Sequence, residues 1–148
     1  MKRLLFILSL VICLLSVPMT GFAAPTEEEQ QKYEDAISAN LKDMLKGSIA
    51  LDKISAENKT YRLNWLNAEN RTEEAKKLVD KIEALEKEQE KDQESMDPYN
   101  KAKKACDVKL NADGANAALE NIIRIQKDRI SDQEELQKLW KQVDRLLK

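Results

Sequence analysis

The sequence predicts an all-α fold, either an elongated antiparallel three-helix bundle or a coiled-coil-like helical hairpin. Ala, Glu, Lys, Leu and Arg make up just over half of residues 24–148, a composition that is typical of long helices and coiled coils. Glycine and proline interrupt this stretch only at Pro25, Gly47, Pro98 and Gly114. Apolar residues recur every three or four positions, which places them along one face of a helix.

The first predicted helix begins after Pro25, where Thr26 and Glu29 have the spacing of a capping box. Its apolar face consists of Tyr33, Ile37, Leu41, Met44, Leu45, Leu51, Ile54, Tyr61, Trp65 and Ala68. Gly47 within this helix predicts a weak point, a kink or a close contact with another helix. The Asn-rich residues 64–70 predict the turn that follows, and residues 55–58 are a second candidate.

A second helix is predicted over residues 71–96. Its apolar seam consists of Ala75, Leu78, Ile82 and Leu85. Asp97 and Pro98 predict a break, because aspartate caps helices and proline suits their first turn. Whether this break ends the helix or only kinks it decides between three and four helices. The segment beyond the break has one apolar face, which consists of Tyr99, Ala102, Cys106 and Leu110.

The last helix is predicted over residues 115–147, after a turn at residues 111–116. Its stripe consists of Leu119, Ile122, Ile123, Gln126, Ile130, Gln133, Leu136, Trp140, Val143 and Leu147. Ser131 and Glu134 repeat the capping-box spacing, which predicts a kink near Ser131. Gln126 and Gln133 are typical of polar positions that set the register of a helix–helix contact.

Residues 1–23 have the three parts of a secretory signal peptide: basic Lys2 and Arg3, an apolar run, and small residues before a cleavage site. We expect residues 24–148 to form a single helical domain in the periplasm or outside a bacterial cell, with no stable membrane span after cleavage. A retained anchor is less favoured, because the apolar run is shorter than the roughly 20 residues that cross a bilayer. Lipidation at Cys13 is a third alternative, although the preceding Ile12 is large for such a site.

The composition lacks the residues on which most catalytic and metal sites depend. Residues 24–148 contain 23 basic and 27 acidic residues, so their net charge of −4 does not favour nucleic-acid binding. The chain has no histidine, and residues 24–148 hold one cysteine and two glycines. Histidine-based catalysis, cysteine–histidine zinc sites and glycine-rich phosphate loops therefore lack their residues. We predict a protein that is not an enzyme, with no cofactor and no catalytic, cofactor-binding or metal-binding residues.

The predicted partner is another envelope or secreted protein, with self-association as an alternative, because so thin a core benefits from outside support. The candidate interaction residues are Trp65, Trp140, Gln126, Gln133 and Leu136. Tryptophan is over-represented at the centres of protein interfaces. Both tryptophans also lie on apolar stripes, where they would instead anchor the core.

Cys106 has three interpretations. It can pack as a small apolar residue on the face that it shares with Tyr99 and Leu110. Because it has no partner in residues 24–148, it can also form an intermolecular disulfide in an oxidising compartment. Lys103 and Lys109 would favour its thiolate, which makes a reactive thiol the third interpretation.

Residues 110–139, LNADGANAALENIIRIQKDRISDQEELQKL, resemble the C-terminal region of minor pilus subunits from conjugation and type IV secretion systems. The likeness lies in an Ala- and Asn-rich turn before a Gln- and Leu-rich final helix, in a chain with a signal peptide. It covers about a fifth of the sequence. It implies a non-enzymatic tip or assembly subunit whose helix at 115–147 contacts the pilus or another subunit, and it assigns no individual residue.

Three functions follow from these observations. The first is a helical binding module that docks on another envelope protein. The second is a subunit of a conjugation or secretion apparatus. The third is a periplasmic coiled-coil chaperone or spacer, whose polar helix tip at residues 86–94 grips or separates its clients.

Overall fold

The computed structural model describes residues 24–148, so the predicted signal peptide at 1–23 lies outside the described residues. The described helices are α2 (Glu27–Asn67), α3 (Glu73–Asp92), α4 (Asp97–Val108) and α5 (Ala112–Leu146). Residues 24–148 contain no strand, which confirms the all-α prediction. None of these helices combines the length and apolar character that crossing a membrane requires.

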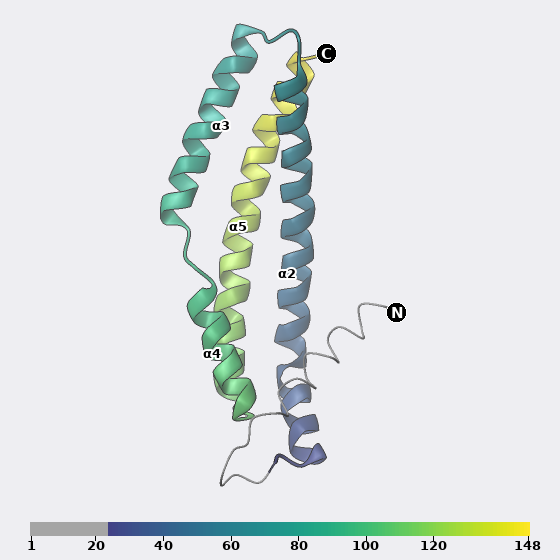
Figure 1. Cartoon of the computed structure of the whole chain (residues 1–148), viewed down its shortest axis with the longest axis vertical. Helices are drawn as coiled ribbons and strands as arrows, with labels where there is room; N and C mark the ends of the chain where they lie inside the picture. The colour runs from purple at the N-terminus through teal and green to yellow at the C-terminus, as the bar shows by residue number, and fades with distance from the viewer. Residues whose placement is uncertain (1–23) are drawn as a thin grey trace.

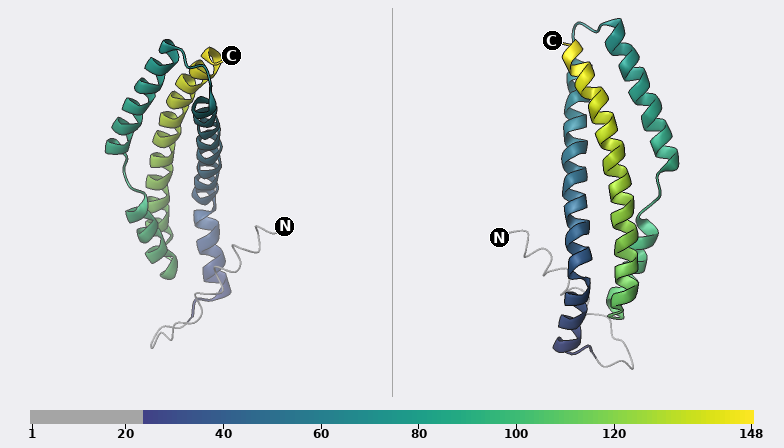
Figure 2. Two further views of the ribbon diagram at one scale, coloured as in Figure 1. Left: turned by 45° about the horizontal axis from the view of Figure 1, so that its top comes forward. Right: turned by 180° about the vertical axis from the view of Figure 1, so that it is seen from behind.

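The helices form an elongated arrangement around α5 (Figure 1). α2, α3 and α4 each pack against α5, which lies between α2 and α3 from every side shown (Figure 2). α3 and α4 together run antiparallel to α5, whereas α2 runs parallel to it. Cross-helix hydrogen bonds agree with this direction, since Asn40 bonds Asn116 and Asn64 bonds Asp144 at similar sequence separations of 76 and 80.

The predicted capping box at the start of α2 is confirmed. The Glu29 backbone N–H donates to the Thr26 hydroxyl at 3.2 Å, and the Thr26 backbone N–H donates to the Glu29 carboxylate at 2.8 Å. The bond from the Thr26 backbone, reinforced by its hydroxyl, holds the pKa of Glu29 below its ordinary value. Two of the otherwise unpaired donors of this helix end are therefore satisfied.

Replacing Thr26 with alanine should lower the free energy of unfolding by about 1 kcal/mol, because the first turn of α2 loses its cap. Urea denaturation followed by helical circular dichroism measures this loss. Ser38→Ala is the matched control, since Ser38 is exposed inside the same helix and bonds only the Asp35 carbonyl. Equal losses in the two variants would show that the cap contributes nothing of its own.

α2 continues unbroken through Gly47, so the close-contact interpretation of this glycine is confirmed. A Cβ atom at position 47 would lie 2.6 Å from Oε1 of Gln126 in α5. The prediction of a turn at residues 55–58 is wrong, because these residues lie within α2 and Asn58 is buried. The turn predicted at residues 64–70 is confirmed in part, since residues 64–67 are the last of α2 and residues 68–72 connect it to α3.

The second half of the chain corrects several predicted boundaries. α3 ends at Asp92 and residues 93–96 separate it from α4, so the break ends the helix. Asp97 is the first residue of α4 and not its cap, which is Met96. The predicted turn at 111–116 is wrong, because Asn111 is the N-cap of α5 and accepts a hydrogen bond from the Gly114 N–H at 3.1 Å. The chain instead reverses just before it, where Leu110 has a φ of 50°.

The capping box predicted at Ser131 and Glu134 is also wrong, since α5 runs without interruption through both residues. A helix start leaves backbone donors without partners, and a capping box is useful only there. Within α5 those donors are already bonded to the preceding turn, so the sequence pattern has no structural role at this place.

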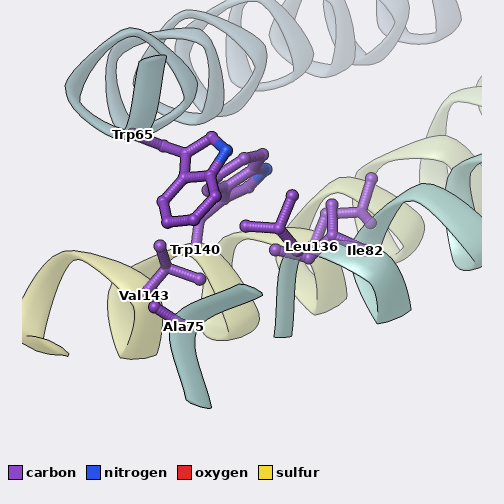
Figure 3. Packing of buried hydrophobic residues seen from close by; sticks show 7 residues of the cluster. Trp65, Ala75, Ile82, Leu136, Trp140 and Val143 are labelled. Atoms are coloured by element: carbon purple, nitrogen blue, oxygen red, sulfur yellow. The ribbon is translucent and has the colours of Figure 1, made fainter. Parts of the chain in front are cut away.

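The apolar core of the described residues falls into two clusters. The tryptophan cluster consists of Trp65, Ala75, Val79, Ile82, Leu136, Trp140 and Val143 (Figure 3). The tyrosine cluster, at the opposite end of the molecule, consists of Tyr33, Ile37, Ala115 and Leu119. Between them, the middle of α5 contributes the buried Ile122 and Ile125, together with the polar Gln126 and Arg129.

The tyrosine cluster is tied to α4 by a polar contact. The Tyr33 hydroxyl donates a hydrogen bond to Asp107 of α4, and Lys103 pairs with the same carboxylate at 2.8 Å. Burial, followed by the bond to Asp107, raises the pKa of Tyr33 above its ordinary value. The phenol therefore stays protonated and keeps its donor over the whole physiological pH range.

Candidate interaction surface

Two polar pairs cross the interface between α2 and α5 in the middle of the molecule. The Asn58 side-chain amide donates to the backbone carbonyl and the side-chain oxygen of Gln133, both at 2.9 Å. The Gln126 amide donates to the Ser48 hydroxyl at 2.8 Å. Asn58 and Gln126 are buried, so a shift of one helix along the other would leave amides unpaired. The structure thus places both glutamines at a helix–helix contact within the chain.

Trp65, Trp140 and Leu136 lie inside the tryptophan cluster. Their exposed fractions are 8%, 2% and 2%. The two indoles point toward one another from α2 and α5 (Figure 3). The guanidinium of Arg62 lies 5.6 Å from the centre of the Trp140 ring and also pairs with Glu86 of α3. These side chains join α2, α3 and α5, and they have little surface left to offer another protein.

Cys106 is half-buried on α4, where it packs against the tyrosine cluster. Its Sγ lies 2.6 Å from where a Cβ of residue 114 would be, so Gly114 allows α4 and α5 to approach closely here. Cys106 forms no disulfide with any described residue. This placement agrees with the core interpretation, while the intermolecular disulfide and the reactive thiol stay predictions.

A hollow of about 130 Å³ opens beside α5 where α3 gives way to α4. Its lining residues are Gln93, Glu94, Arg124, Ile125, Asp128, Arg129 and Asp132. Arg124 pairs with Glu94 at 2.5 Å, which ties the linker to α5 and raises the pKa of the guanidinium. A neighbouring hollow of about 320 Å³ shares Gln93, Glu94 and Arg129 with it. Small-molecule sites are largely apolar, so these charged hollows do not resemble one. Within residues 24–148, no His, Cys, Asp and Glu side chains gather as a metal site would require.

One carboxylate in the smaller hollow is held in an unfavourable environment. Burial raises the pKa of Asp132, and the nearby charges of Asp128 and Glu135 raise it further. Since the folded pKa lies above the unfolded value, ionised Asp132 opposes folding, and this penalty disappears as the pH falls below the ordinary pKa of 3.8.

Asp132→Asn should therefore stabilise the protein at pH 7 by a few tenths of a kcal/mol, a figure that allows for solvent screening. The gain should vanish near pH 3, and urea denaturation at the two pH values measures it. Asp43→Asn is the control of opposite sign, because Lys46 lowers the pKa of Asp43 and its ionised form favours folding. A gain that persists unchanged at pH 3 would exclude the electrostatic explanation.

Four of the five large hydrophobic side chains that are exposed among the described residues lie on α2. Leu45, Ile49, Leu63 and Leu66 are 44%, 69%, 49% and 57% exposed. They belong to a row in which the spacing alternates between four and three residues, which we call the outer seam. Its members are Leu45, Ile49, Asp52, Ala56, Lys59, Leu63 and Leu66. Each of the seven is exposed, and such spacing is typical of a helix that packs against another helix.

A second row with the same spacing faces the core, and we call it the inner seam. Its members are Tyr33, Ile37, Asn40, Met44, Gly47, Leu51, Ile54, Asn58, Tyr61 and Trp65. Every one of these residues is buried or half-buried. In a seven-residue repeat the two rows lie on nearly opposite faces of the helix. α2 therefore carries one apolar face against α5 and another that no described helix covers.

The interaction residues that the sequence predicts do not include the outer seam. The predicted apolar face places Leu45 with Tyr33 and Ile37, and the structure corrects this, because Leu45 is exposed. The row can be found by counting in steps of four and three from Leu45. The inner seam has the same spacing and larger apolar residues, so it gives the stronger pattern in the sequence. No protein-family model, curated protein or solved structure matches the chain.

Proposed function

We propose that this protein is a non-catalytic helical binding module of the bacterial envelope, which docks on another protein through the outer seam of α2. The observation that carries this proposal is the exposure of all seven seam residues in a regular four-three pattern. An exposed row of apolar residues with helical spacing is a typical docking surface for an amphipathic helix, and here Asp52 and Lys59 interrupt that row. Export by residues 1–23 would place this surface in the periplasm or outside the cell.

The outer seam supports docking through α2 better than docking through α5. α5 is packed against three other helices, and most of its large apolar side chains are buried among them. A minor pilus or assembly subunit, as the resemblance of residues 110–139 implies, remains the second proposal. Its contacts would then involve the outer seam and the polar surface of α5.

The chaperone or spacer proposal is weaker. It needs residues 86–94 to project as a polar tip that grips a client. In the structure this segment lies along the middle of α5, where Glu94 pairs with Arg124 and the Gln89 amide approaches the Asp132 carbonyl at 3.5 Å. A segment bonded in this way has no free tip to present.

Photo-crosslinking in living cells tests the leading proposal. A photoreactive residue at position 49 should give crosslinked products, which mass spectrometry identifies. The same residue at position 138, which is exposed on α5, is the matched control and should give few. Equal products at both positions, or none at position 49, would contradict docking through α2.

The exported protein should begin at Ala24 when its mass is measured after purification from the periplasm or the medium. This outcome follows from the small residues before position 24 and the short apolar run. An intact chain recovered from the membrane fraction would instead support a retained anchor, and a lipid adduct on Cys13 would support lipidation.

A further inference from the structure

We infer that the occupant of the outer seam is α2 of a second copy of this chain, packed in antiparallel orientation as a two-fold symmetric dimer. This inference rests on the proposed role of the outer seam as a docking surface and goes further by naming the partner. It is carried by the length of the seam, the positions of its two charges and the free edge of the molecule on which it lies.

The length and spacing of the seam suit helix pairing. From Leu45 to Leu66 the row spans three heptads, or roughly 32 Å of helix at 1.5 Å per residue. A repeat of seven keeps the same face toward a neighbouring helix over that length. The other described helices do not obstruct it, because the backbone of α2 lies close only to that of α5, and α2 lies at one edge of the molecule (Figure 2). The contacts of α2 with α3 and α4 come from other side chains, Arg62 and Tyr33 among them.

The charges within the seam decide the orientation. Asp52 and Lys59 are both exposed, and neither forms an ion pair with another described residue. In a parallel pair each would meet the same residue of the second copy, and like charges facing one another are unfavourable. In an antiparallel pair Asp52 of each copy lies opposite Lys59 of the other, so the dimer contains two such ion pairs.

The same arrangement matches the apolar residues. An axis midway between Asp52 and Lys59 lies beside Ala56, whose small side chain permits the close approach of two helices. Leu45 then lies near Leu66 of the second copy, and Ile49 lies near Leu63 of the second copy. In this dimer the apolar residues at each end of the seam contact apolar residues of the second copy, and Asp52 and Lys59 each face a residue of opposite charge.

Charge reversal gives the sharpest test. Sedimentation of residues 24–148 over a wide concentration range should show a reversible dimer. Asp52→Lys or Lys59→Asp alone should weaken dimerisation about tenfold or more, and the two together should restore it. Ile49→Ser should weaken it about 100-fold, since an apolar residue is lost from both copies. Circular dichroism should show intact helices in every variant, because all these side chains are exposed.

Cysteine crosslinking tests the orientation in a Cys106→Ser background. Ala56→Cys should form a disulfide-linked dimer on oxidation, because position 56 lies beside the two-fold axis. Leu66→Cys alone should not form one, whereas Leu45→Cys combined with Leu66→Cys should. Self-crosslinking of Leu66→Cys alone would point to a parallel pair and overturn the proposal.

A chain that stays monomeric at high concentration would also overturn the inference. Photo-crosslinking from position 49 to a different envelope protein would in that case leave the proposed function standing. If position 49 crosslinks neither to a second copy nor to another protein, both proposals fail.

Discussion

Replacing Trp140 with alanine should lower the free energy of unfolding by about 3–5 kcal/mol, which is a large part of the stability of a domain of this size. Trp140 is 2% exposed and lies between α2 and α3 on α5. Its removal leaves a cavity beside Trp65 and deprives the Arg62 guanidinium of the ring over which it lies. The cluster loses its contacts with Trp140 on α2, α3 and α5 together, because its members come from all three helices.

Urea denaturation measures this loss, with Trp65 fluorescence as a local probe and helical circular dichroism as a global one. Hydrogen exchange should show faster opening of α3 than of α4, because α3 packs on the tryptophan cluster and α4 on the tyrosine cluster. Val108→Ala is the control, since Val108 is 53% exposed and its truncation should change stability by less than about 0.5 kcal/mol. A loss below about 1 kcal/mol in Trp140→Ala would contradict the assignment of this residue to the core.

Gly47→Leu should destabilise the protein by about 2 kcal/mol, even though leucine favours helices by nearly 1 kcal/mol over glycine. The first atom of the new side chain already falls 2.6 Å from Oε1 and 3.1 Å from the side-chain amide carbon of Gln126. Gln126 is 3% exposed and has little room to move aside. The substitution therefore forces α2 and α5 apart or breaks the bond from Gln126 to Ser48.

A double-mutant cycle isolates this clash. Gln126→Ala removes the atoms that position 47 would strike, so the leucine should cost little in that background and the helix propensity should become visible. We expect a coupling free energy of about 2 kcal/mol, measured by urea denaturation of the four proteins. Additive effects would show that the glycine is needed for some reason other than its contact with Gln126.

Short sequence patterns predict helix ends well where neighbouring residues supply the hydrogen-bond partners of the backbone. The Thr26 capping box and the break at Asp97 and Pro98 each depend on residues within one helical turn, and both are confirmed. The turn predicted at residues 64–70 begins four residues later than predicted. The spacing predicts most of the buried stripe on α5, since Leu119, Ile122, Leu136, Trp140 and Val143 are buried, but it misses the buried Ile125. Burial of such a stripe is the main reason for a long helix to be stable in water.

Residue types that are common both in turns and in helices lead to errors. Asparagine is typical of turns, but the side-chain oxygen of Asn111 caps the start of α5. Residues 55–58 resemble a turn by composition, yet Asn58 lies in the helix interior because Gln133 of α5 supplies its hydrogen-bond acceptors. The role of Asn111 depends on where α5 begins, and the role of Asn58 depends on a hydrogen-bond partner in another helix. Neither can be inferred from the neighbouring residues in the sequence.

The helical character of residues 24–148 and the start of α2 at its capping box follow from the residues alone. Which row on α2 faces the core depends on the packing of the helices. Both rows have the same spacing, so periodicity cannot rank them. The inner seam is buried because it carries Tyr33, Ile37 and Trp65 and can pair its polar members with α5. That choice leaves the outer seam exposed, since one helix cannot turn two opposite faces toward the same neighbour.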